Sequence, residues 1–121
     1  MMLFEVYPAD ATPVSGVIQQ VRALSEGGGD VLFGTDAGFM DVFDPSAEYR
    51  LMAQAMDWRH VLAALTVTPA RRFGQSAQRG RIARGFAADM VLLDGDPAED
   101  AAAFAKVAMT IRAGEVLSRS E

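Results

Sequence analysis

Asp30-Val31-Leu32-Phe33-Gly34-Thr35-Asp36-Ala37-Gly38 is the stretch of sequence that decides the fold of this chain. Its short apolar run ends in a carboxylate between two glycines, which predicts a buried strand over 31–33 that delivers Asp36 to the start of a loop. Loops at the carboxyl ends of parallel strands gather side chains around one ligand crevice. The alternative is that Asp36 closes a turn or caps a following helix.

Helical patterns lie on both sides of this stretch. Upstream, a helix is predicted to begin at Thr12 and to end at Gly27-Gly28-Gly29, with one apolar stripe made of Val14, Val17, Ile18, Val21 and Leu24. Downstream, helices are predicted from Asp44-Pro45, from Asp57 to Leu65, and from Thr68-Pro69 to Gly74. His60 falls off the apolar stripe of its helix, which favours a solvated side chain over a metal ligand.

The sequence changes character after a polar loop over 75–84. Strands are predicted over 88–94, 107–112 and 115–118, with a short helix over 98–104 between the first two. Apolar and smaller or polar residues alternate over 107–112, which predicts a half-buried strand, and Ala113-Gly114 is a turn signal. A further strand is an open possibility over 3–7.

Composition excludes several classes of site. The 121 residues make one domain's worth of chain, half of them hydrophobic, with no cysteine and one histidine. A thiolate nucleophile and a cysteine zinc site are therefore excluded, and a metal site made by this chain alone would depend on carboxylates. No segment approaches the roughly 20 apolar residues of a membrane span, and no leader pattern opens the chain. We expect a cytoplasmic protein without a membrane partner.

Charge is unevenly distributed along the chain. The net charge is −5, which argues against a nucleic-acid partner. Six arginines and no acidic residue lie between Trp58 and Ala88. This basic segment predicts a solvated rim or a contact with an acidic protein surface, and an anion site is the weaker alternative.

Four motifs in order resemble the carboxyl-terminal part of the amidohydrolase superfamily, in particular the imidazolonepropionase-like and prolidase-like metal-dependent hydrolases. They are Phe33-Gly34-Thr35-Asp36-Ala37-Gly38, the helical segment 60–70, the run 80–97, and the segment 107–116 with its Ile111-Arg112-Ala113-Gly114 turn. The resemblance implies an α+β fold. It would contain the last strand and helices of a (β/α)8 barrel over 1–78, and the last strands of the accompanying small β-sandwich over 79–121.

In such enzymes, the resemblance implies, a barrel aspartate at the end of the last strand contacts a divalent metal, usually zinc, and shuttles a proton. Asp36 matches that position as both catalytic residue and metal ligand. Gly38, Phe39 and Met40 follow it closely, so they either line the substrate pocket or belong to the core. The reaction implied is hydrolysis of a carbon–nitrogen bond in a small amide, cyclic amide or dipeptide.

The remaining metal ligands of the superfamily, its paired histidines and its bridging lysine or carboxylate, have no counterpart in this chain. A single aspartate does not make a zinc site, which usually has three protein ligands and a water. We therefore expect a hydrolase fragment that alone binds no metal and lacks activity. Its uncovered helix faces and strand edges predict a homo-oligomer. The alternative is a non-catalytic α+β interaction module derived from such an enzyme.

Overall fold

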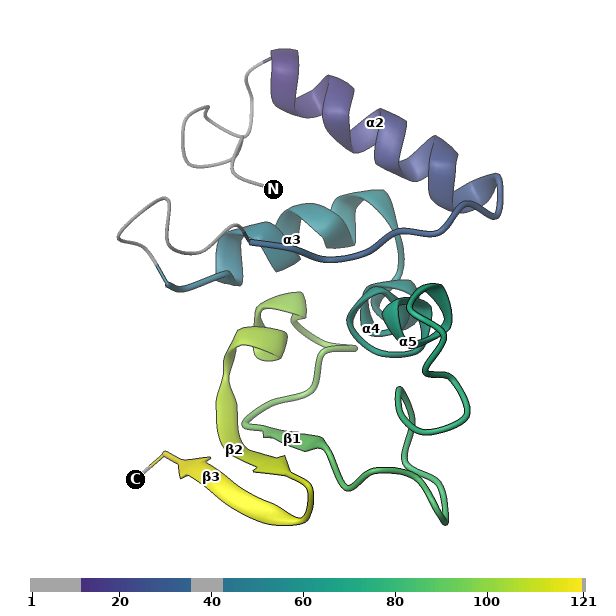
Figure 1. Cartoon of the computed structure of the whole chain (residues 1–121). Helices are drawn as coiled ribbons and strands as arrows, with labels where there is room; N and C mark the ends of the chain where they lie inside the picture. Colours follow the sequence, from purple (N-terminus) through teal and green to yellow (C-terminus); the bar gives the residue numbers. More distant parts are fainter. Residues whose placement is uncertain (1–11, 36–42, 121) are drawn as a thin grey trace.

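Four helices and a three-stranded sheet are arranged in sequence order in the part of the chain described by this computed structural model, residues 12–35 and 43–120 (Figure 1). The helices come first and the sheet follows, with one 3₁₀ helix inserted between its first two strands. The α+β class predicted from the sequence is confirmed. The elements are α2 (Thr12–Glu26), α3 (Ser46–Ala55), α4 (Trp58–Leu65), α5 (Val67–Arg72), β1 (Met90–Leu93), η1 (Ala101–Ala105), β2 (Val107–Arg112) and β3 (Glu115–Arg119).

Helix α2 packs against α3, with its axis inclined to that of α3 (Figure 1). Val14 and Ile18, one helical turn apart, are buried against the core, and Val21 is partly buried against it. The stripe ends there, because Leu24, which the sequence pattern also placed on it, is 50% exposed. Outside this stripe, the guanidinium of Arg22 donates a hydrogen bond to the carbonyl of Gln54 and joins the ends of the two helices.

The helices α3, α4 and α5 follow one another with almost no linker. Met56 and Asp57 separate α3 from α4. The Asp57 carboxylate accepts the backbone N–H of His60 at 3.0 Å and caps α4, which begins where the sequence predicts a helix start. Thr66 separates α4 from α5, and its hydroxyl donates to the carbonyl of Leu62 at 2.7 Å. The predicted third helix is shorter than expected, since α5 ends at Arg72.

The sheet is an antiparallel meander in the order β1-β2-β3. The turn between β2 and β3 is Ala113-Gly114, with φ angles of 51° and 84°. Two positive φ angles in succession are what a two-residue type I′ hairpin turn requires. The Asp89 carboxylate accepts the Ala113 N–H at 2.9 Å, which ties this turn back to the approach to β1. The predicted hairpin is confirmed.

The strand predicted over 107–112 is confirmed as β2, but the alternation of burial predicted along it is wrong. Residues 108–111 of β2 are all half-buried, and every residue of β3 is exposed. The physical reason is that the described part of the chain provides no second sheet to cover one face. Two other bounds also differ, because β1 covers only Met90–Leu93 of the predicted 88–94, and the predicted helix over 98–104 is the 3₁₀ helix η1, capped by Asp100.

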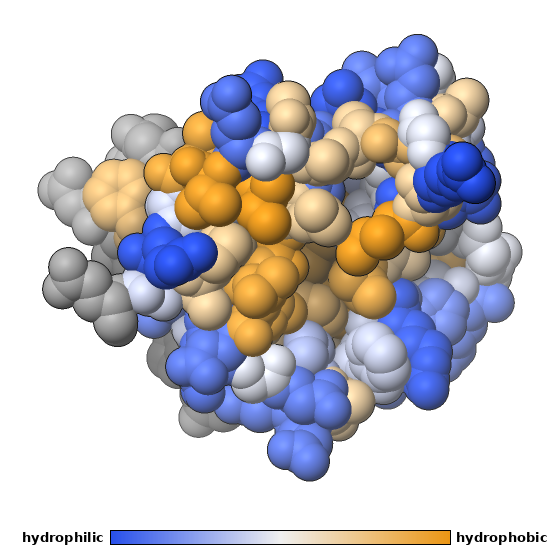
Figure 2. Space-filling view, turned by 90° about the horizontal axis from the view of Figure 1, so that it is seen from below, coloured by the Kyte–Doolittle hydropathy of each residue, from blue (hydrophilic) through white to orange (hydrophobic). Residues whose placement is uncertain are grey.

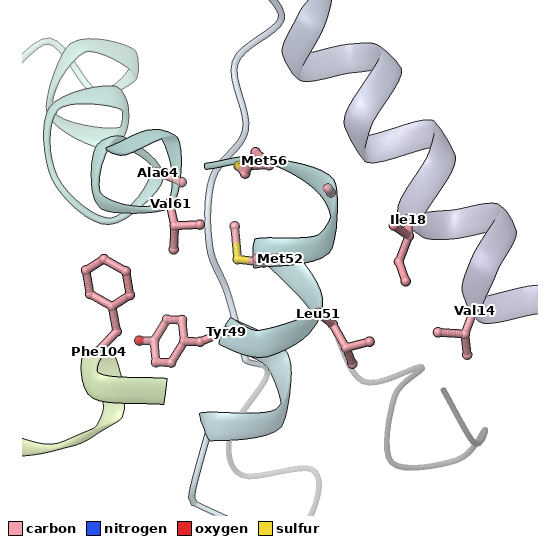
Figure 3. Packing of buried hydrophobic residues seen from close by; sticks show 10 residues of the cluster. Val14, Ile18, Tyr49, Leu51, Met52, Met56, Val61, Ala64 and Phe104 are labelled. Carbon is pink, nitrogen blue, oxygen red and sulfur yellow. The ribbon is translucent and has the colours of Figure 1, made fainter. Parts of the chain in front are cut away.

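The core lies between α2, α3, α4 and η1 (Figure 3). Tyr49 of α3 lies against Phe104 of η1, with ring centroids 5.5 Å apart and planes at 48°. On the other side of α3, Leu51 points toward the helix α2 (Figure 3). The sheet thus connects to the helices mainly through η1. The predicted boundary at residues 78 and 79, and the assignment of the two parts to a barrel and a sandwich, stay predictions.

Among the described residues, no helix has the length and apolar character needed to cross a membrane.

Candidate functional site

The segment 29–35 carries the sequence motif toward Asp36, and its start is held by the turn that follows α2. At its start, the N–H groups of Gly27 and Gly29 donate to the carbonyls of Ala23 and Leu24 at 2.9 and 2.8 Å, which closes the last turn of α2. The chain then reverses and runs extended along α3 (Figure 1). The last described residue of this segment is Thr35.

Side chains of the segment alternate between core and solvent. Val31 and Phe33 pack against the core, whereas Leu32 between them is 41% exposed. The ring of Phe33 stacks on Tyr49 with centroids 4.6 Å apart, and the Phe33 N–H donates to the carbonyl of Ala64 at 3.4 Å. This period of two is that of a β-strand with one face on the helices.

The predicted strand over 31–33 is nevertheless wrong for the described part of the chain, where the segment has no strand partner. Because a strand is defined by hydrogen bonds to a neighbouring strand, extended backbone alone does not make one. The strands of the described residues are β1, β2 and β3, and they pair only with one another. The segment therefore has the side-chain pattern of a strand without the sheet.

The predicted site residues lie outside the described residues. Asp36, predicted as catalytic residue and metal ligand, and Gly38, Phe39 and Met40, predicted to line the substrate pocket, all fall in the range 36–42. Their roles stay predictions, and the described neighbours establish how the chain approaches them.

The donor groups of the described residues do not assemble a metal centre. No group of three or more histidine, aspartate or glutamate side chains in residues 12–35 and 43–120 could hold an ion. His60 has its Nδ1 3.0 Å from the Asp57 carboxylate, and its side chain is 61% exposed, which confirms the solvated position predicted for it. Hydrogen bonds from the backbone and side chain of His60 lower the pKa of Asp57, so this carboxylate serves the helix cap. The described residues do not fit a divalent metal by themselves.

A shallow cavity of about 200 Å³ lies at the start of the segment, between the turn after α2 and the helices α4 and α5. Asp30 and Arg71, which form an ion pair, both line it, together with His60 and Thr68. No local sequence pattern indicates this pair, because 41 positions separate its members. The cavity adjoins residues 28–31 at the start of the segment.

The basic segment between Trp58 and Ala88 uses several of its arginines within the chain. Arg79 lies 3.5 Å from the Asp89 carboxylate, and the guanidinium of Arg81 lies over the ring of Phe86, 4.8 Å from its centroid. Arg59 lies in the same way over Trp58, at 4.6 Å. The contacts of Arg79 and Arg81 lie within the loop between α5 and β1, and that of Arg59 lies within α4. None of them supports the alternative of an anion site.

Solved structures share this arrangement over most of the chain. A prolidase crystallised with N-methylphosphonate-L-proline matches 85% of this chain at 26% identity, with a TM-score of 0.72. Phenylurea hydrolase B matches 82% at 26% identity and a TM-score of 0.68. A Xaa-Pro dipeptidase with bound methionine has a TM-score of 0.75 over 86% of the chain at 24% identity, which shows a common fold.

The chain spans about a quarter of the length of these structures, since each match covers 26% of the solved chain. None of the curated proteins compared with the chain is detectably similar to it. The model of the amidohydrolase family, in contrast, matches residues 7–117, which include the segment leading to Asp36, the helices and the sheet. This chain belongs to the amidohydrolase family.

Proposed function

We propose that this chain is the carboxyl-terminal part of a metal-dependent hydrolase that cleaves a carbon–nitrogen bond in a small amide, cyclic amide or dipeptide. The observation that carries the proposal is the family match over residues 7–117, which contains the segment 29–35 with its strand-like packing on the helices. The same match favours the hydrolase over the non-catalytic interaction module. The activity belongs to a protein of which this chain forms about a quarter of the length.

The alternation of the segment supports Asp36 as the functional carboxylate. Val31 and Phe33 face the helices, and Leu32 is on the opposite face. The period of two puts Gly34 on the same exposed face as Leu32, and the sequence pattern predicts that face for position 36 as well. In a (β/α)8 barrel that face points to the barrel interior, and its carboxyl end carries the catalytic groups.

The chemistry proposed for Asp36 is proton transfer. A carboxylate beside the attacking water accepts its proton and then gives a proton to the leaving amine, so one group acts first as base and then as acid. In the complete enzyme a divalent metal, which we propose to be zinc, would lower the pKa of that water. Asp36 would be one of its ligands, and the other ligands would come from outside this chain.

The first substrates to test are Xaa-Pro dipeptides. Two of the similar structures are a prolidase and a Xaa-Pro dipeptidase by name. Gly38, Phe39 and Met40 are the residues that we propose to border the substrate, because they directly follow Asp36. Loops at strand ends carry specificity in barrels, so changes at Phe39 and Met40 should alter KM more than kcat.

The isolated chain gives the first part of the test. Wild type, Asp36→Asn and Asp94→Asn are incubated with zinc, freed of loosely held ion, and analysed for metal and for hydrolysis of Met-Pro. Asp94 is the matched control, because it is an exposed aspartate in the turn after β1. We expect no stoichiometric metal and no hydrolysis from any of the three. An ion retained by the wild type and lost in Asp36→Asn would contradict the predicted inactivity.

The second part tests Asp36 in a complete barrel. Residues 7–117 replace the matching segment of the prolidase that was crystallised with N-methylphosphonate-L-proline, and the chimera is assayed with Met-Pro. Asp36→Asn should lower kcat by about 10² to 10⁴, the usual contribution of a general acid–base group. Asp94→Asn should leave it within about twofold. A folded Asp36→Asn chimera as active as its parent would refute the proposed role.

A further inference from the structure

Strand β3 is an uncovered edge of the sheet. It pairs with β2 on one side, and in the described part of the chain no strand lies on its other side. All five of its residues are exposed, including Val116 at 53% and Leu117 at 61%. Figure 2 looks at the molecule from below, at the end where Figure 1 has the sheet, and hydrophobic side chains cover much of the centre of this face. An exposed apolar edge is a template for another strand.

The order of residues in β3 makes this edge complementary to itself. The strand reads Glu115-Val116-Leu117-Ser118-Arg119, with one acid at its start and one base at its end. In an antiparallel pair of two such strands centred on Leu117, each Glu115 lies opposite the Arg119 of the other copy. If the register shifts by one residue, Glu115 and Arg119 no longer lie opposite each other. Neither of them then faces another residue of opposite charge.

Leu117 suits the central position of this pair. At the bulge in the β2–β3 pairing, Ile111 lies opposite Val116 and Thr110 opposite Ser118, so Leu117 has no partner residue on β2. Neither Glu115 nor Arg119 forms a salt bridge with a described residue of its own chain. Opposite charges and apolar side chains that face each other across strands both favour pairing.

We propose that two copies of this chain associate through their β3 strands, antiparallel about a two-fold axis at Leu117, into a continuous six-stranded sheet. We choose a second copy as the partner because, in an antiparallel pair, the acid of each strand lies opposite the base of the other. The contact is isologous, since each copy contributes the same patch. Five residues a side make a small interface, and the bulge twists this edge, so the dimer is weak and depends on protein concentration.

The test is a charge-reversal cycle on the full 121-residue chain, measured by sedimentation velocity from about 5 to 300 µM. Glu115→Arg and Arg119→Glu each replace two attractive pairs by two repulsive ones, so each single variant should raise Kd by about tenfold or more. The double variant Glu115→Arg/Arg119→Glu restores opposite charges and should return Kd to within about threefold of wild type. Leu117→Lys places two lysines face to face and should give a monomer.

Effects on folding are separated by the design of the cycle. Arg112 lies opposite Glu115 on β2, so Glu115→Arg also creates a like-charge neighbour within one chain. The double variant also has an arginine at position 115 opposite Arg112. A recovery of its Kd therefore reports on the contact between copies and not on this change within one chain. Val91→Lys is the control for the other edge of the sheet, because Val91 of β1 is as exposed as Val116 of β3. This variant should leave Kd unchanged.

A wild-type chain that stays monomeric up to 300 µM overturns the proposal. The proposal is also overturned if the double variant does not regain the wild-type Kd, or if Val91→Lys abolishes association. Each of these results assigns the contact to another surface. The proposed dimer concerns the 121-residue chain by itself, and it does not involve Asp36. Asp36→Asn should leave the dimer intact, so a failure of the dimer and a failure of the catalytic assignment are distinguishable.

Discussion

Replacing Phe104 with alanine should detach the sheet from the helices. Phe104 is 6% exposed, and its ring lies 5.5 Å from that of Tyr49. Burial of about 150 Å² of aromatic surface, at about 25 cal/mol/Å², is worth about 4 kcal/mol. This agrees with the roughly 3–5 kcal/mol that buried Phe→Ala changes typically cost. A chain of this length has a free energy of unfolding of roughly 6–18 kcal/mol, so the loss is a large fraction of it.

The assay is thermal and urea unfolding followed by circular dichroism. For this chain length, a loss of about 3–5 kcal/mol corresponds to a fall in Tm of about 12–20 °C. Phe73→Ala is the matched control, because Phe73 is 73% exposed and the same atoms are removed. We expect it to change the free energy of unfolding by no more than about 0.5 kcal/mol.

A double-mutant cycle then isolates the ring contact. Tyr49→Leu combined with Phe104→Ala should show a coupling of about 0.5–1.5 kcal/mol, the usual value for an aromatic pair. If Phe104→Ala costs less than about 1 kcal/mol, or if the coupling is zero, η1 does not hold the sheet on α3 through these rings. The role of Phe104 as the link between sheet and helices would then be refuted.

Two further predictions concern local structure. Gly80→Ala should destabilise the chain by about 1–3 kcal/mol more than Gly85→Ala in the same melts. Both glycines have positive φ (96° and 87°), but only at Gly80 would the new Cβ lie 2.7 Å from the Cβ of Ala70. Equal losses of stability would show that backbone strain alone determines the effect. Asp57→Ala should lower Tm at pH 7 through loss of the α4 cap. Since the pKa of Asp57 is lowered in the folded chain from 3.8, the cap stabilises above pH 3.8 and is lost as pH falls through the folded pKa, so Tm values of wild type and variant should converge in acid. Variants that differ by the same amount at every pH would contradict this assignment.

The sequence alone was sufficient wherever structure depends on residues near one another in the chain. The helix start at Asp57 and the turn at Ala113-Gly114 follow from local backbone preferences, and both are found where predicted. The family was recognisable for a related reason, because motifs around Asp36 and in 80–97 keep their order whatever the surroundings. These features require no knowledge of distant contacts.

Tertiary structure decided the features that depend on what lies beside each element. The run 31–33 has the apolar pattern of a strand, yet it pairs with no strand in the described chain, and β3 is exposed along its whole length. The packing of Phe33, Tyr49 and Phe104 likewise joins three distant segments, and no local pattern encodes it. A pattern of apolar residues predicts which face of an element is hydrophobic. Only the neighbouring segments determine whether that face is buried.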